Sequence, residues 1–243
     1  MTDAQTVKRT AYCKWLGKRL PAIGETEDGR VIYDDLTEEF AKLLSRRIDE
    51  HRQNVIVVDG PTGSGKSTFA INLCRAMDPD WRLRPNYIYS KADLAKKLRN
   101  PQSPVSLFDE GSVILNSKNV MRGDDKAIIG LFDTMRSRGW TTVICLPSVY
   151  SLNSVIRTYH TDFLCRMPMR APVYGYDERG FVRIYRNVRN EWSAKSHFTH
   201  CAWTVFKPLS QDVDLVYQVI KSEHQNVMLK RFIGDEEDEE GTE

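Results

Sequence analysis

A glycine-rich segment between an apolar run and a helix-like run has the residue types and the spacing to bind phosphate. Its residues are Gly60, Pro61, Thr62, Gly63, Ser64, Gly65, Lys66, Ser67 and Thr68. They fit the G-x-x-x-x-G-K-[ST] pattern of loops that hold nucleotide phosphates. Glycines let the backbone fold around an anion without Cβ clashes, and N–H groups at the start of the next helix point toward it. All nine residues are therefore predicted to bind ATP.

Two residues of this loop have their own expected roles. Lys66 is expected to reach the β and γ phosphates, and the Ser67 hydroxyl is expected to coordinate Mg²⁺, a hard ion that prefers oxygen ligands. The alternative is a glycine-rich turn that binds nothing. The β-branched run Val55–Val58 before the loop and the helix-like run Phe69–Met77 after it favour the nucleotide site.

A second candidate follows the apolar run Val105–Phe108, which ends in Asp109 and Glu110. Asp109 is expected to belong to the Mg²⁺ shell. Glu110 is expected to orient and deprotonate an attacking water, which hydrolysis needs and phosphoryl transfer to a metabolite does not. The alternative for Glu110 is a solvated loop acid. The acidic pair thus favours an ATPase over a small-molecule kinase.

A third strand-like run, Thr141–Leu146, is followed by Pro147 and Ser148. Ligands of open α/β sheets lie at the carboxyl ends of the strands. Ser148 is therefore a candidate sensor of the γ-phosphate or of the attacking water, with an ordinary turn serine as an equal alternative.

Apolar runs alternate with helical segments along the chain, which predicts an α/β fold with a mainly parallel sheet flanked by helices. The length of 243 residues suits one large domain with small additions. We expect an N-terminal arm or small lobe (1–36), an ATPase core (37–170), a C-terminal β-hairpin and helix (171–234) and a disordered acidic tail (235–243). The hairpin is expected to pair Pro172–Tyr176 with Phe181–Tyr185, and the last helix to cover Val213–Leu229. The core strands are expected at Val55–Val58, Tyr87–Tyr89, Val105–Phe108, Thr141–Leu146 and Phe163–Cys165.

In the order of these elements, residues 54–167 resemble the additional-strand, catalytic-glutamate division of P-loop ATPases. Within that division the chain is similar to the FtsK/HerA superfamily of DNA-pumping motors, which includes viral genome-packaging ATPases and zonular-occludens-toxin-like phage proteins. The similarity extends through Met135–Ser148 to Leu152, Ile156 and Arg157. It implies a RecA-like fold. Many members carry glutamine at the sensor position, where this chain has Leu146 to Ser148.

The resemblance also implies a ring in which one subunit supplies an arginine to the next subunit's phosphate loop. Arg136, Arg138 and Arg157 flank the sensor strand, and Arg138 is the first candidate, with Arg157 second. The alternative is that these arginines bind DNA or solvate a helix end.

The acidic residues are concentrated at the C-terminal end of the chain, and this distribution indicates what kind of partner the rest of the chain could bind. The formal net charge is +2, yet seven of the 33 acidic residues lie in positions 235–243, so the remaining chain has 26 acidic against 35 basic residues, or +9. Such a body is compatible with a polyanion such as DNA. Aromatic and basic residues interleaved near the C-terminus are typical either of a surface that stacks single strands or of a hairpin core. These residues are Tyr174, Tyr176, Arg179, Arg183, Tyr185, Arg186, Arg189, Trp192, Lys195 and Trp203.

Composition narrows the remaining classes. No apolar run approaches the roughly 18 residues that span a bilayer. The N-terminus has no apolar block typical of a secretory signal. We therefore expect a cytoplasmic protein without membrane insertion, located in the host cytoplasm if it is viral. Five widely spaced cysteines favour buried thiols over disulfides. The combined prediction is an ATP-hydrolysing ring motor that translocates DNA, as in viral packaging or DNA export, with a portal or capsid-type protein as a further partner. The alternatives are a helicase loader, a secretion ATPase, a small-molecule kinase and a nucleotide-dependent switch or partitioning protein.

Overall fold

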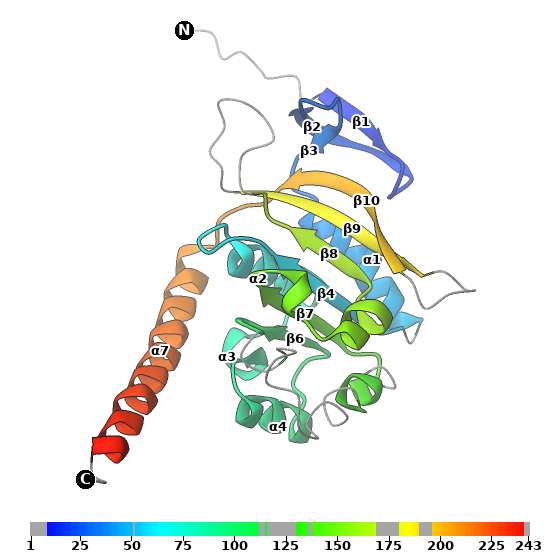
Figure 1. The fold of residues 1–243 in the computed structure, drawn as a ribbon. Helices are drawn as coiled ribbons and strands as arrows, with labels where there is room; N and C mark the ends of the chain where they lie inside the picture. Colours follow the sequence, from blue (N-terminus) through cyan, green and yellow to red (C-terminus); the bar gives the residue numbers. More distant parts are fainter. Residues whose placement is uncertain are drawn as a thin grey trace, which may run out of the picture.

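The computed structural model describes residues 9–50, 52–111, 115, 130–135, 138–168, 180–189 and 196–240, without the side chains of 91, 228 and 230–240. Within these residues ten strands form a single mixed sheet in the order β1-β2-β3-β10-β9-β8-β4-β7-β6-β5 (Figure 1). The strands are β1 (Arg9–Cys13), β2 (Lys18–Glu25), β3 (Val31–Tyr33), β4 (Asn54–Asp59), β5 (Tyr87–Ile88), β6 (Val105–Phe108), β7 (Thr141–Leu146), β8 (Phe163–Arg166), β9 (Phe181–Arg189) and β10 (Ser196–Val205).

Five neighbouring strands, β8-β4-β7-β6-β5, are all parallel. The run Val55–Val58 in β4 has no exposed surface, as expected for a strand that is covered on both faces. All five predicted core strands are found, and the expectation of an α/β fold with a largely parallel sheet flanked by helices is confirmed. β7 lies between β4 and β6, so the strand before the glycine-rich loop and the strand before Asp109 are not direct neighbours.

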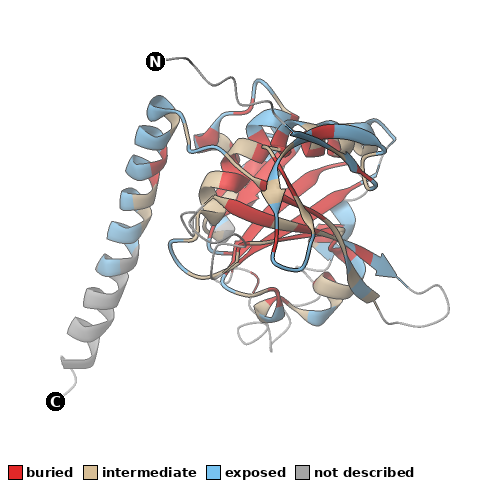
Figure 2. Cartoon of the chain, turned by 90° about the horizontal axis from the view of Figure 1, so that it is seen from above, coloured by how far each residue is buried: buried red, intermediate tan, exposed pale blue. Residues whose placement is uncertain are grey.

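Helices cover both faces of the parallel strands. α1 (Thr37–Asp49) and α2 (Lys66–Met77) bury Phe40 and Phe69 against one face. On the other face Phe132 and Ile156 pack with Val55 and Val57. In Figure 2 the buried residues, drawn in red, gather on the central strands and on the helix surfaces that face them. Short elements complete the body: α3 (Leu83–Asn86), α4 (Lys91–Arg99), η1 (Val149–Ser151) and η2 (Ile156–His160).

The N-terminal segment is not a separate arm or lobe in its described part. β1, β2 and β3 form an antiparallel meander that extends the main sheet, because Ile32 and Tyr33 of β3 pair with Trp203 and Thr204 of β10. Of the turn-forming residues in this segment, Pro21 and Gly24 lie within β2, whereas Gly29, with a φ of 75°, lies in the turn between β2 and β3. The strands are short and separated by turns, so no clear period marks them in the sequence.

The C-terminal hairpin differs from the prediction in its pairing. Phe181–Tyr185 is part of β9, but β9 pairs with β8 on one side and with β10 on the other, antiparallel to both. The expected first strand, Pro172–Tyr176, lies outside the described residues. β10 was not predicted because polar residues interrupt its apolar pattern, as in Ser196–Cys201.

The last helix, α7 (Gln211–Glu240), is longer than the predicted Val213–Leu229 and extends away from the body (Figure 1). Its bounds include the acidic run Asp235–Glu240, which we expected to be disordered. Glutamate is a good helix former, and adding residues to an existing helix carries no nucleation cost. The four cysteines Cys13, Cys74, Cys145 and Cys165 are free and buried, as predicted, and Cys201 is free and partly buried.

Candidate functional site

The glycine-rich loop lies at the carboxyl end of β4 and leads directly into α2. Gly60, Gly63 and Gly65 have φ angles of 149°, 77° and 88°, which side chains rarely allow. A Cβ on Gly60 would lie 2.7 Å from Cβ of Met167, and one on Gly65 would lie 2.9 Å from the Phe206 ring. Among the described residues no side chain caps the start of α2. Its first N–H groups are therefore available for an anion.

Lys66 is folded back onto the loop that precedes it. Its Nζ donates to the carbonyl oxygens of Gly60 at 2.9 Å and Pro61 at 2.7 Å. Burial lowers the pKa of Lys66, and the nearby Cys145, Asp109, Asp59 and Glu110 oppose this shift. An ammonium held by two carbonyl oxygens can exchange them for phosphate oxygens.

Ser67 and Asp109, the two predicted metal ligands, are in contact. The Ser67 hydroxyl donates to Oδ1 of Asp109 at 2.8 Å, and Asp109 is 5% exposed. A hydroxyl and a carboxylate at this separation supply the hard oxygen donors that Mg²⁺ takes, with water and phosphate completing the shell. The donor set therefore fits the predicted ion.

Two tyrosines that sequence reasoning missed hold the other oxygen of Asp109. Tyr87 of β5 and Tyr217 of α7 donate to Oδ2 at 3.0 and 3.1 Å. Burial is the main cause of a raised pKa at both hydroxyls, so they remain protonated donors. Asp109 is thus fixed by three hydroxyl groups from three different elements.

Glu110 occupies an unusual backbone position. Its φ is 53°, in the left-handed region, which costs a non-glycine residue about 1–3 kcal/mol. The next residue, Gly111, donates its N–H to the Cys145 carbonyl at 2.9 Å. The Tyr89 hydroxyl donates to Oε2 of Glu110 at 3.3 Å. Strain of this kind gathers at functional sites, and here it turns an exposed carboxylate toward the loop side of the sheet.

These residues surround one pocket of about 370 Å³. It is lined by Thr62, Gly63, Gly65, Lys66, Ser67, Thr68, Asp109, Glu110, Cys145, Leu146, Pro147, Tyr217 and Lys221. The structure thus brings together most of the predicted loop, both acids and the end of β7. Tyr217 and Lys221 come from α7 and had no sequence signal, because α7 begins 143 residues after Thr68 and nothing in the sequence links it to the loop.

Ser148 is not among the described residues that line this pocket. Its hydroxyl caps η1 by accepting the N–H of Tyr150 at 3.3 Å. This contact is typical of an ordinary turn serine.

The two described candidate arginines, Arg138 and Arg157, are not among the residues that line the pocket of the chain's own loop. Arg138 precedes β7 and lies over the Trp140 ring at 5.6 Å, whereas the loop follows the opposite ends of the parallel strands. Six residues of strand, about 20 Å, separate these two edges. Arg157 of η2 lies over the Tyr150 ring at 5.3 Å, and Arg136 lies outside the described residues.

An ion pair next to the loop was also missed. Asp59, the last residue of β4, accepts from Nε and Nη2 of Arg166 at 3.0 and 2.8 Å. Both residues end neighbouring parallel strands. The sequence signal for this ion pair was that residues of opposite charge directly follow two of the predicted strands.

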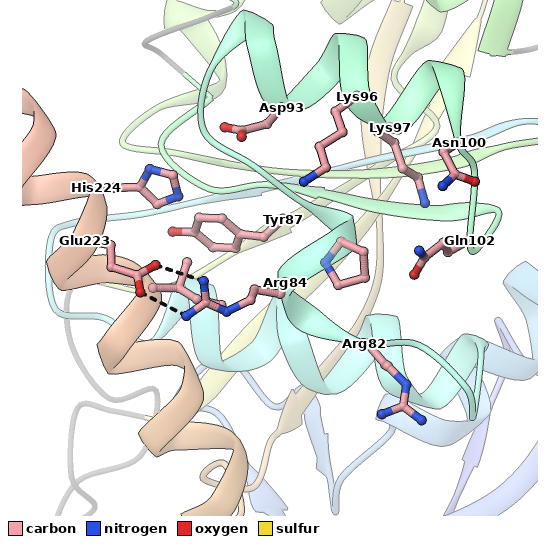
Figure 3. A pocket seen from close by; sticks show the side chains of 12 residues that line it. Arg82, Arg84, Tyr87, Asp93, Lys96, Lys97, Asn100, Gln102, Glu223 and His224 are labelled. Carbon is pink, nitrogen blue, oxygen red and sulfur yellow. Dashed lines mark hydrogen bonds and ion pairs between the residues drawn. The ribbon is translucent and has the colours of Figure 1, made fainter.

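α7 packs against α3 and β5 next to the phosphate-loop pocket. Glu223 forms a two-pronged ion pair with Arg84, at 2.9 and 3.1 Å, and His224 stacks on Tyr87 with ring centroids 5.6 Å apart (Figure 3). Both contacts border a second pocket of about 530 Å³ between α3, α4 and α7. Tyr87 therefore connects the attachment of α7 to Asp109.

Part of the predicted stacking surface forms a compact cluster. Arg183 lies between the rings of Tyr185 and Trp203, at 4.8 and 5.3 Å from the centroids. The predicted members Tyr174, Tyr176, Arg179, Trp192 and Lys195 lie outside the described residues.

In the described part of the chain no helix has the length and apolar character to cross a membrane. No protein family matches the chain, and no curated protein matches it in sequence.

Proposed function

We propose that this protein is a Mg²⁺-dependent, RecA-like ATPase that uses hydrolysis to move DNA. The observation that carries the ATPase proposal is the contact between Ser67, at the start of α2, and Asp109, at the end of β6. It joins the phosphate loop to the acidic pair across the intervening strand β7. An inserted strand at this place is also what the resemblance to the additional-strand ATPases implies.

The polar residues of the loop and the two acids would share the work of this reaction. The loop N–H groups bind phosphate oxygens, and Lys66 exchanges the Gly60 and Pro61 carbonyls for the β and γ phosphates. Ser67 and Asp109 hold Mg²⁺, which neutralises charge on the phosphates when bound. Glu110, oriented by Tyr89, accepts a proton from the attacking water. Tyr87 and Tyr217 keep Asp109 in place.

DNA is the proposed partner because of charge and resemblance. Outside positions 235–243 the chain has an excess of nine basic residues, and the FtsK/HerA-like segment implies a DNA motor. Packaging of a viral genome or export of DNA, with a portal or capsid-type protein partner, is the corresponding biological role.

The test is steady-state ATP hydrolysis with and without double-stranded and single-stranded DNA. We expect Mg²⁺-dependent turnover that DNA stimulates. Turnover that is indifferent to both forms of DNA would contradict the DNA part and leave an ATPase for another substrate. Transfer of phosphate to a small acceptor without hydrolysis would contradict the ATPase itself.

A ring is proposed as the working assembly, with Arg138 as the first candidate for an arginine supplied in trans. Mixing two inactive variants, Arg138→Ala and Lys66→Ala, should restore some activity, because some interfaces then pair an intact loop with an intact arginine. A mixture that co-assembles and stays inactive would remove Arg138 from this role, and Arg157→Ala would be tested next in the same way.

A further inference from the structure

One face of α7 lies toward Asp109 and Glu110 in the phosphate-loop pocket. Along this helix Tyr217 donates to Asp109, Lys221 follows one turn later, and His224 follows almost one turn after that. His224 stacks on the Tyr89 ring at 4.5 Å between centroids, and Tyr89 donates to Glu110. Residues at these spacings share one helix face. Lys221 therefore lies between the contact to Asp109 and the contact toward Glu110.

Among the described residues, no carboxylate neutralises the charge of Lys221. Its contact within the described residues is with the Tyr217 ring, with Nζ 5.8 Å from the centroid, and none of the carboxylates described pairs with it. The side chain is partly buried and lines the phosphate-loop pocket. Such a pocket suits an anionic ligand bound together with a metal ion, because the ammonium group can contact the anion while the two carboxylates of the pocket face the metal ion.

The position of α7 is fixed on both sides of Lys221. Tyr217 precedes it, and the Glu223–Arg84 ion pair and the His224–Tyr87 stack follow it (Figure 3). The rotation of the helix about its axis is thereby set, and with it the face that carries Lys221.

From this geometry we propose that Lys221 is a second phosphate-binding lysine of the nucleotide site, supplied by the C-terminal helix, and that it contacts the terminal phosphate of ATP. The proposal rests on the proposed ATP site. The terminal phosphate is the part of the nucleotide nearest to the hydrolytic Glu110, and Lys221 lies at the level of the two acids. Lys66 would reach the same phosphates from the loop, and Lys221 lines the same pocket from α7.

The experiment compares ATP and ADP binding to the full-length protein with Mg²⁺ by titration calorimetry. Lys221→Met keeps the unbranched stem beside Tyr217 and removes the charge. We expect it to weaken ATP binding about 10-fold or more, equivalent to about 1.4 kcal/mol, and to change ADP binding much less. Lys221→Arg should recover most of the ATP affinity. Lys96→Met is the matched control, because Lys96 is an exposed lysine that borders the neighbouring pocket instead.

Unchanged ATP affinity in Lys221→Met, or an equal loss for ATP and ADP, would overturn the proposal. If the Met variant melts early, the ratio of ATP to ADP affinity in Lys221→Gln and Lys221→Arg decides by the same criteria. A folded wild-type protein that binds no ATP would overturn the ATP site itself. A wild-type protein that binds ATP, a Lys66→Ala variant that does not and an insensitive Lys221→Met would overturn the role of Lys221 alone.

Discussion

Asp59 and Arg166 tie the end of β4 to the end of β8 by two hydrogen bonds of 3.0 and 2.8 Å. The Asp59 side chain is 3% exposed and also accepts the N–H of Val149 at 3.1 Å. One carboxylate thus joins three elements directly before the phosphate loop.

Removing the arginine should destabilise the protein. Arg166→Met leaves a buried carboxylate with fewer partners, and we expect the free energy of unfolding to fall by about 1–3 kcal/mol. Urea denaturation measures this. Arg84→Met is the control, since it breaks a two-pronged pair on the surface and should change stability little. Equal effects of the two variants would mean that burial of Asp59 does not matter.

Lys66 and Glu110 should separate binding from hydrolysis. Lys66→Ala is expected to abolish ATP binding, because the lysine compensates phosphate charge in the ground state. Glu110→Gln should bind ATP and lose about 10²- to 10⁴-fold in turnover, the usual effect of removing a general base. Nucleotide titration and steady-state ATPase assays measure the two effects. Near wild-type turnover in Glu110→Gln would remove it from the mechanism.

The tyrosines on Asp109 should affect the metal dependence of the ATPase. Tyr217→Phe removes one hydroxyl from Oδ2 of Asp109, and we expect the Mg²⁺ concentration for half-maximal activity to rise about 10-fold, as for partners of metal ligands elsewhere. Tyr87→Phe should act in the same direction. Exposed Tyr12 gives the control Tyr12→Phe. A loss of activity that added Mg²⁺ does not recover would contradict a role in positioning the metal ligand.

His200 should make the fold sensitive to acid. Burial, with Arg183 and Arg30 nearby, lowers the pKa of His200 from 6.5 to about 4. Between these values the unfolded chain binds the extra proton, so the stability present above pH 6.5 is lost as the pH falls toward 4. His200→Gln should therefore reduce the drop in the urea midpoint between pH 7 and pH 5. His197→Gln, at an exposed position of the same strand, should leave that drop unchanged, and the idea fails if both variants behave alike.

DNA binding should depend steeply on salt, because phosphate contacts release counterions. We expect affinity to fall strongly between about 50 and 200 mM salt, with little sequence preference. Deleting residues 235–243 should strengthen binding at low salt if the acidic run screens the basic body. Affinity that is constant over this salt range would argue against phosphate contacts.

Local patterns predicted the parallel half of the fold and the loop side of the site. β-branched runs such as Val55–Val58 mark buried strands, and the spacing from Gly60 to Ser67 is specific. The hydroxyls on Asp109 escaped prediction because Tyr87 and Tyr217 lie 22 and 108 residues away in the chain. Their positions depend on how β5 and α7 pack, which no periodicity indicates.

Pairing between distant segments also explains why the N-terminal strands were hard to predict from the sequence. Short strands such as β3 owe their place to pairing with β10, a contact between residues far apart in sequence. The sensor role of Ser148 stays a prediction, and in this structure its hydroxyl accepts the N–H of Tyr150.

The attachment of α7 has a mechanical consequence. The helix is held through Tyr217, Glu223 and His224 and then runs 16 further residues to Glu240, about 24 Å at the usual rise. A stiff rod anchored at one end is a lever, so a tilt of about 10° at the anchor displaces the far end by about 4 Å. A rotation of α7 at its contact with Asp109 would therefore move the far end of the helix much further than the anchored residues.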